Sequence, residues 1–112
     1  MGEIVGRAFR NRSHSVLQDL RIASAAQVEK SIARARRSRE LKLQLFRDGK
    51  ESWTVSIDYD PQKQLFEAYV RPLNSVAEGP LVVPLWRGPE DSLKFEDMIP
   101  LLTRQLEEIA SE

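Results

Sequence analysis

The clearest pattern in the chain is a regular alternation of apolar and polar residues through its middle. Residues 41–46 and 52–59 have an apolar side chain at every second position, which predicts two strands that each bury one face. The segment Asp60-Pro61-Gln62-Lys63 has the composition of a type I turn with proline at its second position. Alternation resumes over residues 64–70. The pattern therefore predicts an antiparallel meander of three strands with a common apolar face.

The loops between these strands are set by the need to keep the apolar residues on one face. Pairing Leu45 with Trp53 leaves a three-residue loop, Asp48-Gly49-Lys50, whose glycine supplies the positive φ of a bulged turn. A two-residue Asp-Gly turn would place the leucines opposite serine and threonine, so we reject it. In the second hairpin a four-residue loop sets Phe66 opposite Ile57.

Two further elements are expected after the meander. Residues 81–86 are apolar enough for a fourth strand, and Pro84 cannot donate a ladder hydrogen bond, which predicts an edge strand or a strand with a bulge. Apolar residues at helical spacing predict a helix over about residues 97–110. Pro100 is then expected in its first turn, with Asp97 as the N-cap. A kinked helix capped by Ser92 is the alternative.

Helical spacing also dominates the chain before the meander. Capping boxes beginning at Ser15 and Ser24 predict a short helix over about residues 14–22 and a longer one over about residues 25–38. A single curved helix over residues 14–38 is the alternative.

Together these elements indicate an α+β fold: one or two N-terminal helical segments, a three- to four-stranded antiparallel meander, and a C-terminal helix packed on one face of the sheet. The length of 112 residues, with 41% hydrophobic and 30% charged residues, is typical of one globular domain. We expect a basic arm over residues 1–12 and a single domain over residues 13–112.

Charge is distributed unevenly although the net charge is zero. Residues 1–50 hold 12 Lys and Arg against 5 Asp and Glu, and residues 51–112 hold 5 against 12, so the halves carry +7 and −7. This asymmetry indicates an anionic partner, or one half of the chain meeting the other within or between molecules. Basic residues are densest in the stretch Arg34–Lys42, and two of them lie with Lys30 opposite the apolar stripe of the predicted helix. The arginines of this stretch are Arg34, Arg36, Arg37 and Arg39.

Few residues are of the kind that catalysis needs. The chain has no cysteine, which excludes disulfides, thiolate metal sites and cysteine nucleophiles, and His14 is its only histidine. Asp58 and Asp60 bracket Tyr59 like half of a carboxylate metal site, but no calcium-loop pattern surrounds them. There is no glycine-rich phosphate loop and no nucleophile elbow. We therefore expect no enzymatic activity, no cofactor and no metal site.

The second face of the meander is another candidate surface. The alternation places Leu65, Tyr69 and Arg71 there, and a tyrosine beside an arginine can stack on a base. Asp58 and Glu67 on the same face would repel phosphate, which favours a protein contact or partial cover by an N-terminal helix.

These observations favour a non-enzymatic assembly or adaptor protein that acts through protein–protein contacts. Its basic N-terminal helix would engage an acidic surface on another protein or on a second copy, as a subunit of a homo-oligomer or a larger complex. Its open sheet face, or an edge strand near Val82, would offer a further contact. The alternative is a small nucleic-acid-binding protein that uses the Arg34–Lys42 stretch on phosphates. We assign partner binding to Arg34, Arg36, Arg37, Arg39, Leu65, Tyr69 and Arg71.

Membrane attachment is not indicated by the sequence. No stretch reaches the ~18 consecutive apolar residues that span a bilayer. The N-terminal residues lack the apolar core of a secretory signal. We therefore expect a cytoplasmic protein without a membrane partner.

Overall fold

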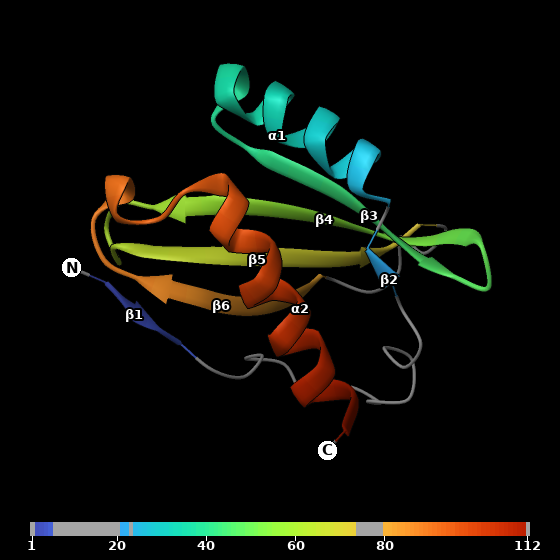
Figure 1. Ribbon diagram of the computed structural model, residues 1–112. Helices are drawn as coiled ribbons and strands as arrows, with labels where there is room; N and C mark the ends of the chain where they lie inside the picture. The colour runs from blue at the N-terminus through green and yellow to red at the C-terminus, as the bar shows by residue number, and fades with distance from the viewer. Residues whose placement is uncertain (1, 6–20, 23, 74–79, 112) are drawn as a thin grey trace.

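The structure is a computed structural model that describes residues 2–5, 21–22, 24–73 and 80–111 (Figure 1). In chain order, the elements are β1 (Glu3–Ile4), β2 (Arg21–Ile22), α1 (Ala25–Ser38), β3 (Leu41–Arg47), β4 (Lys50–Asp60), β5 (Leu65–Pro72), β6 (Leu81–Arg87), a 3₁₀ turn (Glu90–Ser92) and α2 (Phe95–Ser111).

The strands form one curled antiparallel sheet in the order β1-β6-β5-β4-β3-β2. Strands β3 to β6 are a meander, and the two short early strands lie at its opposite edges. Both helices cover the same face, with α1 beside β3 and α2 crossing the strands (Figure 1). The core lies between that face and the helices. Its members of 2% exposure or less include Ala35 of α1, Met98 and Leu102 of α2, and Leu41, Leu43, Leu45, Val55, Ile57, Ala68, Val70, Leu81, Val83 and Leu85 of the sheet.

The expected fold of N-terminal helices followed by three to four strands is wrong. Among the described residues the sheet has six strands, and the first helix follows two of them. Arg21 and Ile22, expected at the end of a helix over residues 14–22, form β2 and pair with Phe46 and Leu45. Strands of two residues are too short to show a period of two, so alternation cannot reveal them. The rest of that helix, and residues 1 and 6–12 of the predicted arm, lie outside the described residues.

Helix α1 confirms the longer predicted helix and excludes a continuous helix over residues 14–38, because Ile22 belongs to a strand. Its apolar stripe is buried at Ile32 and Ala35. It ends at Ser38, and the C-cap Arg39 has a left-handed φ of 64° and donates its backbone N–H to the Ala35 carbonyl. Glycine is the usual residue at such a helix end, because other residues are strained there.

The first hairpin differs from the expectation in its turn but not in its main pairing. Leu45 pairs with Trp53, as predicted. The turn is the two-residue Asp48-Gly49, and both residues have positive φ, 53° and 77°, as in a type I′ turn. Without a bulge, this turn would place the leucines opposite serine and threonine, which is why the alternation predicts a longer loop. A β-bulge resolves the conflict, since Ser52 is an extra residue in β4 that restores the register.

The second hairpin is shifted by two residues from the expected register. Phe66 pairs with Tyr59 instead of Ile57, and Asp60 still belongs to β4. The loop is therefore residues 61–64. The carboxylate of Asp60, just before the loop, stabilises it by accepting hydrogen bonds from the backbone N–H groups of Gln62 and Lys63, at 2.9 and 3.3 Å. A shift of two residues leaves the apolar face unchanged.

Strand β6 confirms the predicted bulge but is not at the edge of the sheet. Leu85 is the extra residue next to Pro84, and β1 pairs with the outer side of β6 through Ile4 and Trp86. Gly2 lies against the indole of Trp86 so closely that an added Cβ would lie 1.9 Å from its Nε1 atom. Only a glycine permits this approach of β1 to β6.

Helix α2 begins at Phe95, two residues before the expected N-cap Asp97. Pro100 therefore lies in the second turn instead of the first, where its missing N–H removes one intrahelical hydrogen bond. Burial of the apolar stripe on the sheet compensates for this loss. The stripe is Met98, Leu102, Leu106 and Ile109, each at most 6% exposed.

Candidate functional site

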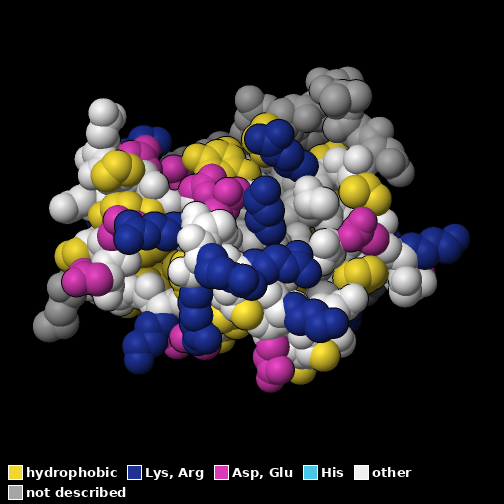
Figure 2. Space-filling model, turned by 90° about the horizontal axis from the view of Figure 1, so that it is seen from above, with side chains coloured by type: hydrophobic (Ala, Val, Ile, Leu, Met, Phe, Trp, Pro, Cys, Tyr) yellow, Lys and Arg dark blue, Asp and Glu magenta, His cyan; other side chains and the backbone are white. Residues whose placement is uncertain are grey.

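The outward face of helix α1 is strongly basic. At 100° per residue, Lys30, Arg34 and Arg37 lie opposite the buried pair Ile32 and Ala35. All three basic side chains are exposed. Figure 2, which looks down on α1, shows Lys and Arg side chains gathered in the middle of the view. The helix thus presents one face to the core and the opposite, cationic face to solvent.

The side of α1 that faces α2 carries a paired arginine. The guanidinium of Arg36 donates a hydrogen bond to the carboxylate of Glu96, which lies in the first turn of α2. Below this pair is a cleft of about 280 Å³ between the two helices. Its walls include both positive and negative groups, because Arg39 and Glu90 line it together with Arg36. Its apolar floor and walls are Ile57, Tyr59, Phe66, Leu93, Phe95 and Met98.

The other side of α1 borders a larger and more basic hollow, which we call the basic groove. Its volume is about 460 Å³, and three cationic side chains, two hydroxyls and one carboxylate line it. These residues are Ser31, Arg34, Arg37, Ser38, Glu40 and Lys42. The hydroxyl of Ser38 lies 3.2 Å from the Arg34 carbonyl and 3.3 Å from the Glu40 carbonyl, both acceptors for its single proton. This contact fixes the chain between helix and strand at the end of the groove.

The cations of the basic groove differ from Arg36 in their surroundings. Within the described ranges, no carboxylate forms an ion pair with Arg34, Arg37 or Lys42. The same holds for Arg39, although it lines the cleft on the other side. Groove and helix face therefore keep an excess of positive charge, with Glu40 as the one carboxylate among the described residues that line the groove.

The second face of the sheet holds the remaining residues that the sequence assigned to partner binding. Leu65 is buried, with 2% of its surface exposed, so the expectation that it offers an apolar contact is not met. Tyr69 is half-buried and Arg71 is exposed. These residues belong to β5, which β4 separates from β3, and they point away from both helices. The structure therefore divides the assigned residues between two surfaces.

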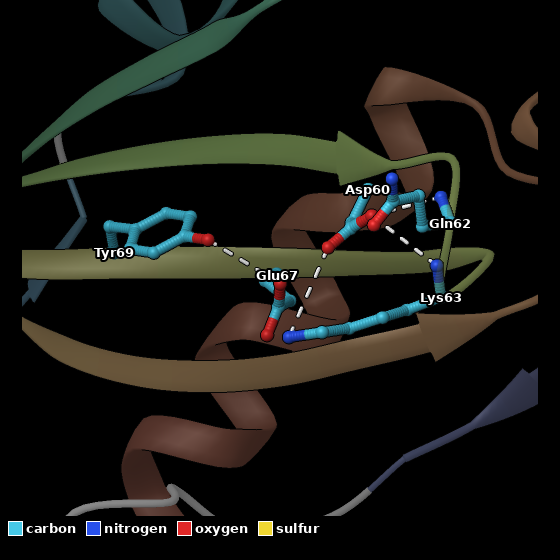
Figure 3. A network of polar contacts seen from close by, with 5 residues as sticks. All are labelled: Asp60, Gln62, Lys63, Glu67 and Tyr69. Atoms are coloured by element: carbon cyan, nitrogen blue, oxygen red, sulfur yellow. Dashed lines mark hydrogen bonds and ion pairs between the residues drawn. The ribbon is translucent and has the colours of Figure 1, made fainter.

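Acidic and phenolic groups interact on this second face (Figure 3). The Tyr69 hydroxyl donates to the carboxylate of the buried Glu67 at 3.4 Å. Lys63 approaches the Asp60 carboxylate at 3.9 Å, beside the loop contacts of that aspartate. Asp58 stands directly across from Glu67 in the strand pairing. Carboxylates in this arrangement disfavour contact with an anion such as phosphate.

The acidic surroundings also shift proton affinities. Burial raises the pKa of Tyr69 above 10.0, and the nearby Glu67 carboxylate raises it further. Burial likewise raises the pKa of Asp58 above 3.8, Glu40 adds to the shift, and Lys42 opposes it. Glu40 and Lys42, which both line the basic groove, thus lie close enough to Asp58 to shift its pKa.

Part of the basic groove was accessible to sequence reasoning. The density of arginines from Arg34 to Lys42 and their place on the helix both pointed to it. Ser31, Ser38 and Glu40 were missed because serines and an isolated glutamate at these positions have no distinguishing spacing. Only the turn that brings β3 back under α1 places them around one hollow.

No group of three His, Asp or Glu side chains in the described ranges is placed to hold a metal ion. No helix in those ranges is both long and apolar enough to cross a bilayer. No known family model, curated protein or solved structure matches this chain.

Proposed function

We propose that this protein is a non-enzymatic interaction module that binds an acidic protein partner through the basic face of α1 and the adjoining groove. It acts as an adaptor or as a subunit of a larger assembly. One observation carries the proposal: Arg34 and Arg37 are exposed without a carboxylate partner in the described part of the chain, whereas Arg36 of the same helix has one.

The composition of the groove supports a protein partner over a nucleic acid. Glu40 stands among the cations, and hydroxyls of Ser31 and Ser38 line the same hollow. A continuous nucleic-acid track needs several phosphate contacts in a row. A mixed surface suits the carboxylates and amides of a polypeptide. The acidic second face of the sheet cannot extend a phosphate-binding surface.

The proposal is tested with poly-L-glutamate as an acidic polypeptide and with a mixed-sequence single-stranded oligonucleotide. We expect the polypeptide to bind more tightly, with an affinity that falls as salt screens exposed charges. Reversal of both groove arginines, Arg34→Glu with Arg37→Glu, should weaken binding at least tenfold. The control is Lys94→Glu with Arg104→Glu, which reverses two exposed charges next to and within α2, one of them paired with Glu108, and should leave the affinity unchanged.

Each outcome decides between partners. Tighter binding of the oligonucleotide, lost in the same double variant, would show a nucleic-acid partner instead. Equal weakening by the α2-side control would show that only net charge matters, which contradicts a specific surface. Light scattering of the free protein tests whether the partner is a second copy. A dimer that dissociates in the Arg34→Glu, Arg37→Glu variant would show that it is.

A further inference from the structure

The position of the basic groove relative to β3 restricts how a partner can lie in it. The side chains of Leu41 and Leu43 are buried toward the helices, so Lys42 between them points to the opposite face of the sheet. Arg34 and Ser38 reach the groove from the helix-covered face. A hollow lined from both faces must pass around the edge of the sheet. The edge of β3 is therefore the floor of the groove.

That edge is open over most of its length among the described residues. On one side, β3 pairs with β4 from Leu41 to Arg47. On the other side, β2 pairs only with Leu45 and Phe46. The segment Leu41–Gln44 thus has no described strand beside it, over a length of about 13 Å. Unpaired N–H and C=O groups on such an edge are a template for an added strand.

Charge determines which strand fits this edge. Side chains of an added strand would alternate between the two faces. Those on the helix-covered face would meet Arg34 and Arg37, and those on the opposite face would meet Lys42. The two arginines favour carboxylates in the helix-facing row, whereas Asp58 and Glu40 lie near Lys42 and weaken that preference in the opposite row.

We propose that the basic groove binds an extended acidic segment of a partner protein by strand addition to Leu41–Gln44, with alternate carboxylates on Arg34 and Arg37. This inference rests on the proposed function, and it specifies the conformation and chemistry of the partner. Main-chain hydrogen bonds to β3 give such a complex its affinity, and the arginines give it its preference for acidic side chains.

The test uses a short fluorescein-labelled peptide of alternating glutamate and valine, with fluorescence anisotropy as the readout. In an extended strand, all glutamate N–H groups point to one side and all valine N–H groups to the other. One peptide is N-methylated on its glutamates and another on its valines. We expect one of these two peptides to lose at least tenfold in affinity and the other to bind like the parent. Binding of the parent should also slow hydrogen exchange within Leu41–Gln44.

The outcomes separate this inference from the proposed function. If both methylated peptides bind like the parent while Arg34→Glu with Arg37→Glu still abolishes binding, strand addition is wrong and the basic surface stands. If the unmethylated peptide does not bind although poly-L-glutamate does, strand addition is again wrong. If the double reversal changes neither interaction, the proposed function itself fails. Arg34→Gln with Arg37→Gln, which removes charge without reversing it, should weaken the parent peptide less than the reversal does.

Discussion

The two flanks of helix α1 carry the same kind of residue in different surroundings. Toward α2, Arg36 pairs with Glu96 over a cleft that mixes both signs of charge. Toward the edge of β3, Arg34 lines a groove in which no described carboxylate pairs with a cation. Two arginines two positions apart are thus divided into one that joins the helices and one that remains available. The difference arises from the neighbouring element, because α2 supplies a carboxylate that pairs with Arg36, whereas Glu40 beside β3 lines the groove without pairing with Arg34.

The largest expected effect concerns the packing of α1 on the sheet, which sets the orientation of its two flanks. Ala35 is fully buried on the side of α1 that faces the sheet. We expect Ala35→Asp to lower the free energy of unfolding by about 3 kcal/mol or more, because a carboxylate there has no room and no partner. Urea denaturation measures this loss. Ala33→Asp on the exposed side of the same helix is the control and should change stability by less than about 0.5 kcal/mol. Similar losses in both variants would contradict the described packing.

The second prediction concerns the end of the helix, where the flanks meet. Arg39 has a left-handed backbone, so Arg39→Gly should stabilise the protein by about 0.5–1 kcal/mol through relief of strain. The same change two residues earlier, Arg37→Gly, should destabilise it by about 1 kcal/mol, since that residue is helical. Thermal unfolding of both variants measures the two effects. Effects of the same sign would show that Arg39 is not strained.

The third prediction compares the two flanks directly. A double-mutant cycle with Arg36→Ala and Glu96→Ala should give a coupling energy of about 0.2–1 kcal/mol, the range of exposed ion pairs, and high salt should reduce it. The corresponding cycle with Arg34→Ala and Glu96→Ala should give no coupling. Chemical denaturation of the four proteins in each cycle measures both values. A coupling of equal size in the second cycle would erase the distinction between the flanks.

The smallest effect concerns Asp58, which senses Glu40 and Lys42 of the groove. Because its pKa is raised by burial and by Glu40, the folded protein binds this proton more tightly than the unfolded chain does. The stabilisation is complete below the ordinary pKa of 3.8 and is lost as the pH rises through the raised value. Asp58→Asn should therefore raise the melting temperature at neutral pH, and the gain in free energy of unfolding should be well under about 1 kcal/mol because the group is largely solvated. The difference should vanish in acid, and one that grows in acid would reverse the sign of the shift.

Long elements with a strong hydrophobic period were predicted correctly, whereas strands that pair with distant parts of the chain were not predicted. Alternation located β3, β4 and β5, and helical spacing located α1 with its bounds. The short strands β1 and β2 form only by pairing with edge strands that are distant in the sequence. Ile4 of β1, for example, pairs with Trp86 of β6. The bulge at Ser52 was missed for a related reason, since a two-residue turn looked impossible until an extra residue compensated for it.

The candidate site divides in the same way. The arginines were found because charge density is a local property of the sequence. The sequence did not predict which arginine forms an ion pair, because that depends on where Glu96 lies in space. Leu65 was assigned to an exposed surface from alternation alone, and alternation identifies a face without stating how well that face is covered.

The placement of β1 and β2 at opposite edges has a consequence for the order of folding. Neighbours within the β3–β6 meander adjoin each other in sequence, so little chain must be closed to pair them, whereas β1 reaches β6 only across most of the chain. Closing a longer loop costs more entropy and slows the pairing that depends on it. We expect the meander to assemble first and β1 to dock onto finished β6 as a late step, in which the close contact between Gly2 and Trp86 forms last.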